Sequence, residues 1–309
     1  MLLAGSKRLM KCALAARVFR RESKLPEPFR SEVLATLWRL SSNSRLQQSS
    51  VSIAGNEVIH RGEFQLRYMF NEIFLDACYF FRADTERPLI LDCGSNIGMS
   101  ILFFKKLYPG ARIVGFEPDP LTFDTLQKNI AGNGLADVTV HGFALGDRDE
   151  KRPFFRATER DRSDLTMSLW KRRHDRCELE VECRRLSGFF ANDEIDLLKI
   201  DVEGAEQEVL SDLATSGKLQ LVKQMHIEYH HHIDLKVDAL SRTLRLLEDE
   251  GFGYQLVANS SRFLAPHFQD ILIRCYRKPH NVTLAPAVVD QWSDEPWLSD
   301  VESRFSWHL

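Results

Sequence analysis

The stretch Leu89-Ile-Leu-Asp-Cys-Gly-Ser-Asn-Ile-Gly98 decides the fold of this 309-residue chain. It begins as an apolar run, passes through an acid, and then places two glycines four residues apart. A second apolar run further along the chain ends at Phe116-Glu-Pro-Asp119, again with an acid. Short apolar runs that lead into glycine turns are typical of buried parallel strands followed by helices. The two runs therefore predict a strand, a tight turn, a helix and a second strand arranged around a nucleoside.

The same alternation of strand and helix continues along the chain. Five strands are expected, at residues 88–93, 112–116, 138–143, 195–200 and 222–228. Two final strands, 253–258 and 270–276, can pair as a terminal antiparallel ribbon. This alternation predicts an α/β fold with a Rossmann-like, mostly parallel sheet of seven strands that carries helices on both faces.

We divide the chain into three parts. Residues 1–50 form a helical, basic N-terminal extension, residues 51–279 form the main domain, and residues 280–309 form a C-terminal tail without a clear period. Within the main domain, residues 147–187 carry dense charges of both signs and interrupt the alternation. We interpret this segment as a surface excursion, either a β-hairpin or a lid. An aromatic-rich helix is expected over residues 65–81, before the first strand of the sheet.

Composition and charge limit the class of protein. The net charge of -3 gives no global argument for a nucleic-acid partner or an anionic membrane. No apolar run approaches the roughly 20 residues that a membrane-spanning helix needs, so we expect no transmembrane segment. The six cysteines form no CxxC pair and fit reduced, buried thiols in the cytoplasm. The basic, acid-free residues 1–21 leave open a peripheral membrane contact or organelle targeting.

The glycine turn carries the cofactor prediction. It has the form Asp92-x-Gly94-x-Asn96-x-Gly98, whereas a dinucleotide fold shows GxGxxG with the pyrophosphate at the helix N-terminus. A carboxylate beside the turn repels a pyrophosphate but suits a cationic ligand. S-adenosylmethionine carries a sulfonium, an ammonium and no phosphate, so it is the expected cofactor. Glu117 ends the second strand, where a carboxylate can bind both ribose hydroxyls.

Four segments of the chain match segments of a known family. They are Leu91-Asp-Cys-Gly-Ser-Asn-Ile-Gly98, Phe116-Glu-Pro-Asp-Pro120, Ala144-Leu-Gly-Asp147 and Leu198-Lys-Ile-Asp-Val-Glu-Gly-Ala-Glu206. With these segments the chain resembles the FkbM-type methyltransferases, over about residues 65–230. The last segment is the specific one, because many methyltransferases share the glycine turn. The resemblance implies a class I methyltransferase sheet, S-adenosylmethionine as the methyl donor, and an oxygen acceptor on a small molecule or sugar.

Further candidates follow the third and fourth strands. Asp147 can accept a hydrogen bond from the adenine amino group, or it simply closes a charged turn. Asp201 is expected to hold the ammonium of the donor or to orient the acceptor hydroxyl. Glu203 can serve the same site or the N-terminus of the following helix, where the helix dipole favours an acid. Lys199 lies in an apolar strand, so a neighbouring carboxylate is expected to pair with it.

The stretch His226-Ile-Glu-Tyr-His-His-His232 supplies the candidates for a general base. Alternation along a strand places His226, Glu228 and His230 on one face, provided that the strand continues beyond Glu228. Histidine has a suitable pKa to accept the proton of a hydroxyl, and we predict Asp201, Glu228 and His230 as catalytic residues. The same side chains can hold a divalent metal, or they form a polar strand end without chemistry. Because no definite ligand spacing supports a metal, we predict none.

Together these features predict an S-adenosylmethionine-dependent O-methyltransferase that acts on a hydroxyl of a small molecule or sugar. An N-methyltransferase and a non-catalytic binding protein that retains the fold are the alternatives. A nucleic-acid methyltransferase is typically marked by Asp/Asn-Pro-Pro-Tyr/Phe after the fourth strand. Asp201-Val-Glu-Gly204 stands in that place, so no nucleic-acid partner is predicted.

Overall fold

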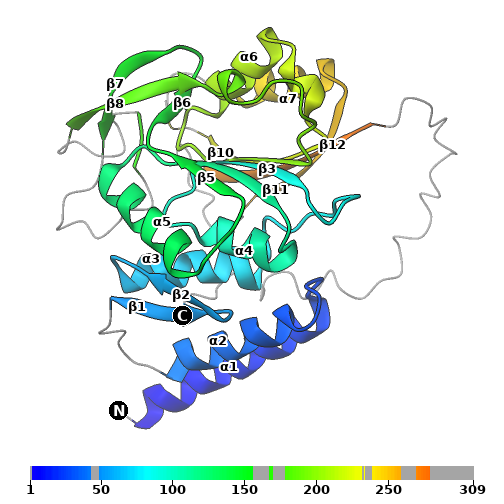
Figure 1. The fold of residues 1–309 in the computed structure, drawn as a ribbon. Helices are drawn as coiled ribbons and strands as arrows, with labels where there is room; N and C mark the ends of the chain where they lie inside the picture. Colours follow the sequence, from blue (N-terminus) through cyan, green and yellow to red (C-terminus); the bar gives the residue numbers. More distant parts are fainter. Residues whose placement is uncertain are drawn as a thin grey trace, which may run out of the picture.

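A seven-stranded sheet forms the centre of the molecule (Figure 1). The computed structural model describes residues 2–42, 49–155, 167–169, 178–231, 233, 239–258 and 269–278. The strands of the sheet are β3 (Leu89–Cys93), β4 (Arg112–Phe116), β5 (Val138–His141), β9 (Leu197–Ile200), β10 (Gln224–His231), β11 (Phe252–Ala258) and β12 (Gln269–Arg277). Their order is β11-β12-β10-β9-β3-β4-β5. The five neighbouring strands β10, β9, β3, β4 and β5 run parallel, and β12 is antiparallel to both of its neighbours. The predicted mostly parallel, Rossmann-like sheet is confirmed.

Helices cover both faces of this sheet. Helices α4 (Met99–Leu107) and α5 (Pro120–Gly132) lie on one face, and α6 (Glu206–Thr215) and α7 (Leu240–Asp249) lie on the other (Figure 1). Strand β3 is buried along its whole length because its side chains alternate between two apolar layers. Ile90 packs in the layer that contains Phe103 of α4, and Leu91 packs in the layer that contains Val209 of α6.

The N-terminal extension is a layer of the same core. Helices α1 (Leu2–Glu22) and α2 (Phe29–Ser42) lie beyond the hairpin of β1 (Ser50–Ile53) and β2 (Asn56–Ile59) (Figure 1). Phe19 of α1 and Leu37 of α2 belong to one continuous apolar cluster with Phe74 and Phe103. The extension therefore packs as part of the fold that it precedes.

The aromatic-rich helix ends earlier than the sequence predicts. It consists of α3 (Glu63–Met69), which continues as the π-helix η1 (Phe70–Leu75). The Asp76 amide donates to the carbonyl of Asn71, which is the five-residue spacing of a π-turn. Ala77 has a φ of 48°, in the left-handed region, so the helix cannot continue to residue 81.

The charged excursion is a small sheet of its own. It consists of β6 (Ala144–Gly146), β7 (Glu150–Phe155) and β8 (Glu178–Arg185) in the order β6-β8-β7. Strands β7 and β8 are antiparallel, and β6 joins β8 in parallel. The 3₁₀-helices η3 (Leu186–Phe189) and η4 (Lys218–Leu221) complete the described elements. The predicted tail 280–309 lies outside the described residues.

Two further predictions concern membrane-spanning helices and the cysteines. No helix in the described part of the chain is long and apolar enough to cross a membrane. Five cysteines there are free and buried: Cys12, Cys78, Cys93, Cys183 and Cys275. Their burial agrees with the interpretation of these five as core residues.

Candidate active site

A cavity of about 370 Å³ lies at the carboxyl ends of the parallel strands. This is the edge of an open α/β sheet where ligands bind, and the sequence predicts the site there. Residues from the turns after β3, β4 and β9 and from β10 itself line it together. The predicted site residues in the lining are Gly94, Asn96, Glu117, Asp201, Glu203, Glu228 and His230.

The two glycines of the turn are required by the packing of the chain itself. Gly94 has a φ of 86°, and a Cβ at this position would lie 1.8 Å from the carbonyl oxygen of Asp201. Gly98 has a φ of 92°, and a Cβ there would lie 2.8 Å from Leu126 Cδ1. Glycine adopts these left-handed conformations without steric cost. Gly94 lines the cavity, whereas Gly98 supports the turn from outside it.

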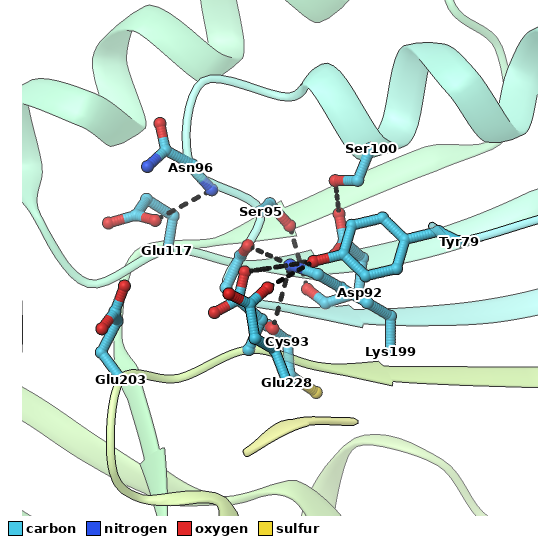
Figure 2. Close-up of polar contacts among 12 residues, drawn as sticks. Tyr79, Asp92, Cys93, Ser95, Asn96, Ser100, Glu117, Lys199, Glu203 and Glu228 are labelled. Carbon is cyan, nitrogen blue, oxygen red and sulfur yellow. Dashed lines mark hydrogen bonds and ion pairs between the residues drawn. The ribbon is translucent and has the colours of Figure 1, made fainter. Parts of the chain in front are cut away.

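Glu117 lies where the sequence predicts a ribose-binding carboxylate. Its Oε2 accepts a hydrogen bond of 3.0 Å from the Asn96 amide (Figure 2). Its Oε1 accepts one of 2.9 Å from the Asp119 amide. Burial raises the pKa of Glu117 to about 8, although both backbone donors favour the charged form. Two fixed donors hold the carboxyl group in one orientation at the cavity wall, where it can accept further hydrogen bonds from a diol.

Asp92 lies beneath the cavity rather than in its lining. Its side chain is fully buried, and it accepts a hydrogen bond of 2.7 Å from Ser100 Oγ. Lys199 Nζ lies 3.3 Å from Asp92 Oδ1 and 3.3 Å from Asp201 Oδ2, and it donates to the carbonyl of Gly94 at 2.6 Å (Figure 2). The expected carboxylate partner of Lys199 is confirmed. The prediction that Asp92 acts on the ligand through its charge is corrected, because this ammonium neutralises it.

Asp147 does not reach the cavity. Its side chain is 40% exposed, and its carboxylate lies 3.7 Å from Arg148. Ala144 and Leu145 of β6 line the cavity in its place, because the chain then turns away into the small sheet. The predicted contact of Asp147 with adenine is therefore corrected, and the charged turn is what the structure shows.

His230 lies inside a ring of carboxylates. Its Nδ1 is 2.7 Å from Glu206 Oε1, and its Nε2 is 3.1 Å from Glu203 Oε2. The same Nε2 lies 3.9 Å from Asp201 Oδ1 and 3.8 Å from Asp270 Oδ1. Burial alone would lower the pKa of His230, but Glu206 and the other carboxylates raise it to about 9. The imidazole is therefore charged at neutral pH.

Glu228 occupies the same face of β10 as His230. The strand continues to His231, so the predicted alternation is preserved, with Ile227 and Tyr229 in the opposite apolar layer. Burial raises the pKa of Glu228 well above its ordinary value, and neighbouring carboxylates raise it further. A carboxylate with a raised pKa is a stronger base than an exposed one.

The same atoms have the spacing of a cation site. Two groups bring their ligand atoms within 4.8 Å of one another: Asp201, Glu203 and His230, and Glu228, His230 and Asp270. Such spacing also arises when several carboxylates share one imidazolium, as they do around His230. We therefore assign no metal to these residues.

Several lining residues carry no motif that the sequence analysis could use. Phe64, Tyr68, Glu72 and Tyr79 come from α3, η1 and the turn that follows them. Asp270 lies at the start of β12. The sequence predicts that the last two strands pair with each other, but it does not predict which other strand of the sheet they lie next to. Strand β12 also pairs with β10, which places Asp270 opposite His230. An acid at the start of an apolar strand was the signal available in the sequence.

Comparison with known proteins identifies the family of the chain. Residues 92–255, which include the glycine turn, Glu117 and the cluster around His230, match the model of the methyltransferase FkbM domain. The chain belongs to the FkbM methyltransferase domain family. The predicted resemblance is confirmed.

Three relatives align with this chain over most of their own length. Methyltransferase 1 of Beauveria bassiana (strain ARSEF 2860) is 31% identical over 211 residues, which are 62% of this chain and 82% of that protein. The 31-O-demethyl-FK506 methyltransferase FkbM of Streptomyces tacrolimicus is 28% identical over 242 residues, or 68% and 90% of the two chains. The 2-O-methyltransferase NoeI of Sinorhizobium fredii (strain NBRC 101917 / NGR234) is 29% identical over 202 residues, or 60% and 79%.

Proposed function

We propose that this FkbM-domain protein is an S-adenosylmethionine-dependent O-methyltransferase that acts on a hydroxyl of a small molecule or sugar. One observation carries the proposal. A single cavity joins the anchored carboxyl group of Glu117 and the glycine turn to Asp201 and Glu228, so a donor site and a proton acceptor share one space.

The lining fits a cationic nucleoside. Glu117 would accept hydrogen bonds from the ribose hydroxyls, and Asp201 would hold the ammonium of the methionine end. Lys199 is the lysine in the described lining. Its ammonium is already paired with Asp92 and Asp201, so it would attract a phosphate only weakly. The remaining acids favour a sulfonium over a pyrophosphate. When bound, S-adenosylmethionine supplies an electrophilic methyl group.

We assign the role of general base to Glu228 and not to His230. A hydroxyl oxygen that gains a methyl group must lose its proton, and a positioned base removes it as the bond forms. The imidazolium of His230 has no free lone pair near neutral pH, whereas Glu228 lines the cavity and, in its ionised form, has a free carboxylate oxygen that burial makes more basic. His230 instead orients Glu203 and Asp201 through its positive charge.

A small-molecule or sugar acceptor is supported by the size of the cavity and by the relatives. A volume of about 370 Å³ is in the range of pockets for small ligands. Two of the relatives named above are a 31-O-demethyl-FK506 methyltransferase and a 2-O-methyltransferase.

Calorimetry followed by a label-transfer screen tests the proposal. S-adenosylmethionine should bind to the purified protein, and NAD should not. Radiolabelled donor should then transfer its methyl group to hydroxyl-bearing metabolites, and Glu228→Gln should lower the rate about 10²- to 10⁴-fold. Binding of NAD, or transfer to amines alone, would overturn the assignment. Loss of turnover in a chelator, restored by Mg²⁺, would overturn the metal-free base mechanism.

A further inference from the structure

The active site extends beyond the region that defines the family. The family model matches residues 92–255, yet Tyr68, Glu72 and Tyr79 reach the cavity from before this region. Among them, Tyr79 touches both carboxylates to which the proposed function gives a role. The segment between the π-helix and the first strand of the sheet is thus part of the site.

The ring of Tyr79 is fixed on several sides. Its side chain is buried, and its ring lies 6.4 Å from that of Phe104. It also stacks against His226 at 6.5 Å, with an angle of 24° between the planes. The backbone before it is held from another strand, because Arg274 Nη2 donates to the carbonyl of Cys78 at 3.1 Å. The position of the Tyr79 hydroxyl is therefore set by the fold and not by a ligand.

This hydroxyl lies between two carboxylates. It is 3.2 Å from Glu228 Oε2 and 3.4 Å from Asp201 Oδ2 (Figure 2). Lys199 Nζ approaches the same Oδ2 from another direction, at 3.3 Å. Burial and the two carboxylates raise the pKa of Tyr79 well above its ordinary value, so the hydroxyl keeps its hydrogen and acts as a donor.

Two of the four carboxylate oxygens are thus restrained by the protein. Asp201 Oδ2 is held by Lys199, which leaves Oδ1 on the side of His230, and the single hydroxyl hydrogen of Tyr79 is directed to the nearer oxygen, Glu228 Oε2. Glu228 has the hydroxyl as its donor at Oε2, and its other oxygen lacks this contact. A donor on one oxygen fixes the rotamer of a carboxylate and favours its charged form.

We propose that Tyr79 is a positioning residue for methyl transfer, whose hydroxyl orients Glu228 as the proton acceptor. This role rests on the proposed function. The hydrogen bond belongs to the protein alone, so it exists before any donor or acceptor binds. The titratable and charged groups around Glu228 are Tyr68, Glu72, Tyr79, Lys199, Asp201 and Asp270 from neighbouring elements, and His230 from its own strand.

The experiment compares Tyr79→Phe with Tyr108→Phe. Both variants remove one tyrosine hydroxyl and keep the ring. Tyr108 serves as the control because its hydroxyl contacts only backbone groups in the described residues, accepting from the Ala83 amide at 2.9 Å and donating to the Phe81 carbonyl at 3.4 Å. Three measurements are made on each full-length variant: donor binding by calorimetry, carboxyl titration by ¹³C NMR, and label transfer to the acceptor pool that supports the wild type.

In Tyr79→Phe we expect S-adenosylmethionine to bind within about twofold of the wild type. The transfer rate should fall about tenfold or more, since a hydrogen bond to a charged group is lost. The ¹³C signal of Glu228, identified by its absence in Glu228→Gln, should titrate about one pH unit higher. Tyr108→Phe should match the wild type in all three measurements.

Two results would overturn the proposal. In one, Tyr79→Phe leaves both the titration of Glu228 and the transfer rate unchanged. In the other, donor affinity and thermal stability fall in step with the rate while the titration stays in place, which is the signature of a packing role. Failure of the wild type to bind S-adenosylmethionine would instead reject the proposed function, and the NMR titration would still report the contact between Tyr79 and Glu228.

Discussion

Lys199 Nζ lies 3.3 Å from Asp92 Oδ1, and their side chains are only 2% and 0% exposed. Asp92 belongs to β3 and Lys199 to β9, so the pair joins the two central strands directly below the cavity (Figure 2). The ammonium also donates to the Gly94 carbonyl and lies near Asp201. This one ion pair therefore fixes the floor on which the glycine turn and the loop after β9 rest.

Replacing Lys199 by methionine should destabilise the protein by about 3–5 kcal/mol, because the carboxylate of Asp92 is then buried without its cation. Urea unfolding followed by circular dichroism measures the loss. Lys128→Met is the control, since Lys128 and Asp124 form an ion pair that is 58% and 59% exposed and contributes at most about 0.5 kcal/mol. The double variant Asp92→Asn/Lys199→Met should recover part of the stability. An equal loss in Lys199→Met and Lys128→Met would contradict the role of the buried pair.

Gly94→Ala should prevent the native turn from forming. Its Cβ would meet the Asp201 carbonyl oxygen at 1.8 Å, which only a shift of the backbone can relieve. Gly134→Ala is the matched control: its φ is also positive, at 59°, but a Cβ there has no neighbour within 4 Å. The control should lose about 1–2 kcal/mol from backbone strain alone. Thermal unfolding checks both variants, and similar melting temperatures would show that the close approach to Asp201 does not matter.

The fold and the donor half of the cavity could be predicted from the sequence because local patterns determine them. The run Leu89–Cys93 is apolar on both faces, and the acid of Glu117 stands at a strand end, so periodicity and spacing place each of them. The carboxyl group of Glu117 is held by two backbone amides, one from its own turn and one from the glycine turn that follows the adjacent strand. Such features require no knowledge of side-chain contacts between distant segments.

The acceptor half could not be predicted because long-range packing assembles it. Tyr79 and Asp201 are 122 residues apart, and no spacing rule links them. Asp270 faces His230 only because β12 inserts next to β10. The sequence also predicts a base at His230, but the carboxylates that hold its proton come from the turn after β9, from α6 and from β12. A pattern along one strand contains no information about those partners.

Glu117→Ala should weaken the binding of S-adenosylmethionine about 100-fold. The reason is that a carboxyl group anchored by two backbone amides would supply two hydrogen bonds to the ribose, each worth up to about 1.5 kcal/mol. Isothermal titration calorimetry measures the dissociation constant. Asp147→Ala is the control, because this acid was predicted for the same ligand but is exposed and outside the cavity lining. Equal weakening in both variants would contradict the placement of the donor.

The pKa of His230 predicts how stability changes with pH. The value of about 9 in the folded protein lies above the ordinary histidine value of 6.5. The folded chain therefore holds this proton more tightly than the unfolded chain does. Its contribution to stability is complete below about pH 6.5 and is lost as the pH rises through 9. The difference between the two pKa values corresponds to about 3 kcal/mol.

Proton NMR of the histidine rings, together with urea unfolding between pH 6 and 10, tests this expectation. The His230 signal should titrate near pH 9, and the free energy of unfolding should fall over the same range. Glu206→Gln removes the nearest carboxylate, which lies 2.7 Å from Nδ1, so it should lower the His230 midpoint. His226 serves as the internal control. Burial lowers its pKa to about 3, with a smaller contribution from the charge of Arg274, so its signal should stay constant throughout. A His230 midpoint near 6.5, unchanged in Glu206→Gln, would show that the ring is not held as a cation, and the base role would then return from Glu228 to His230.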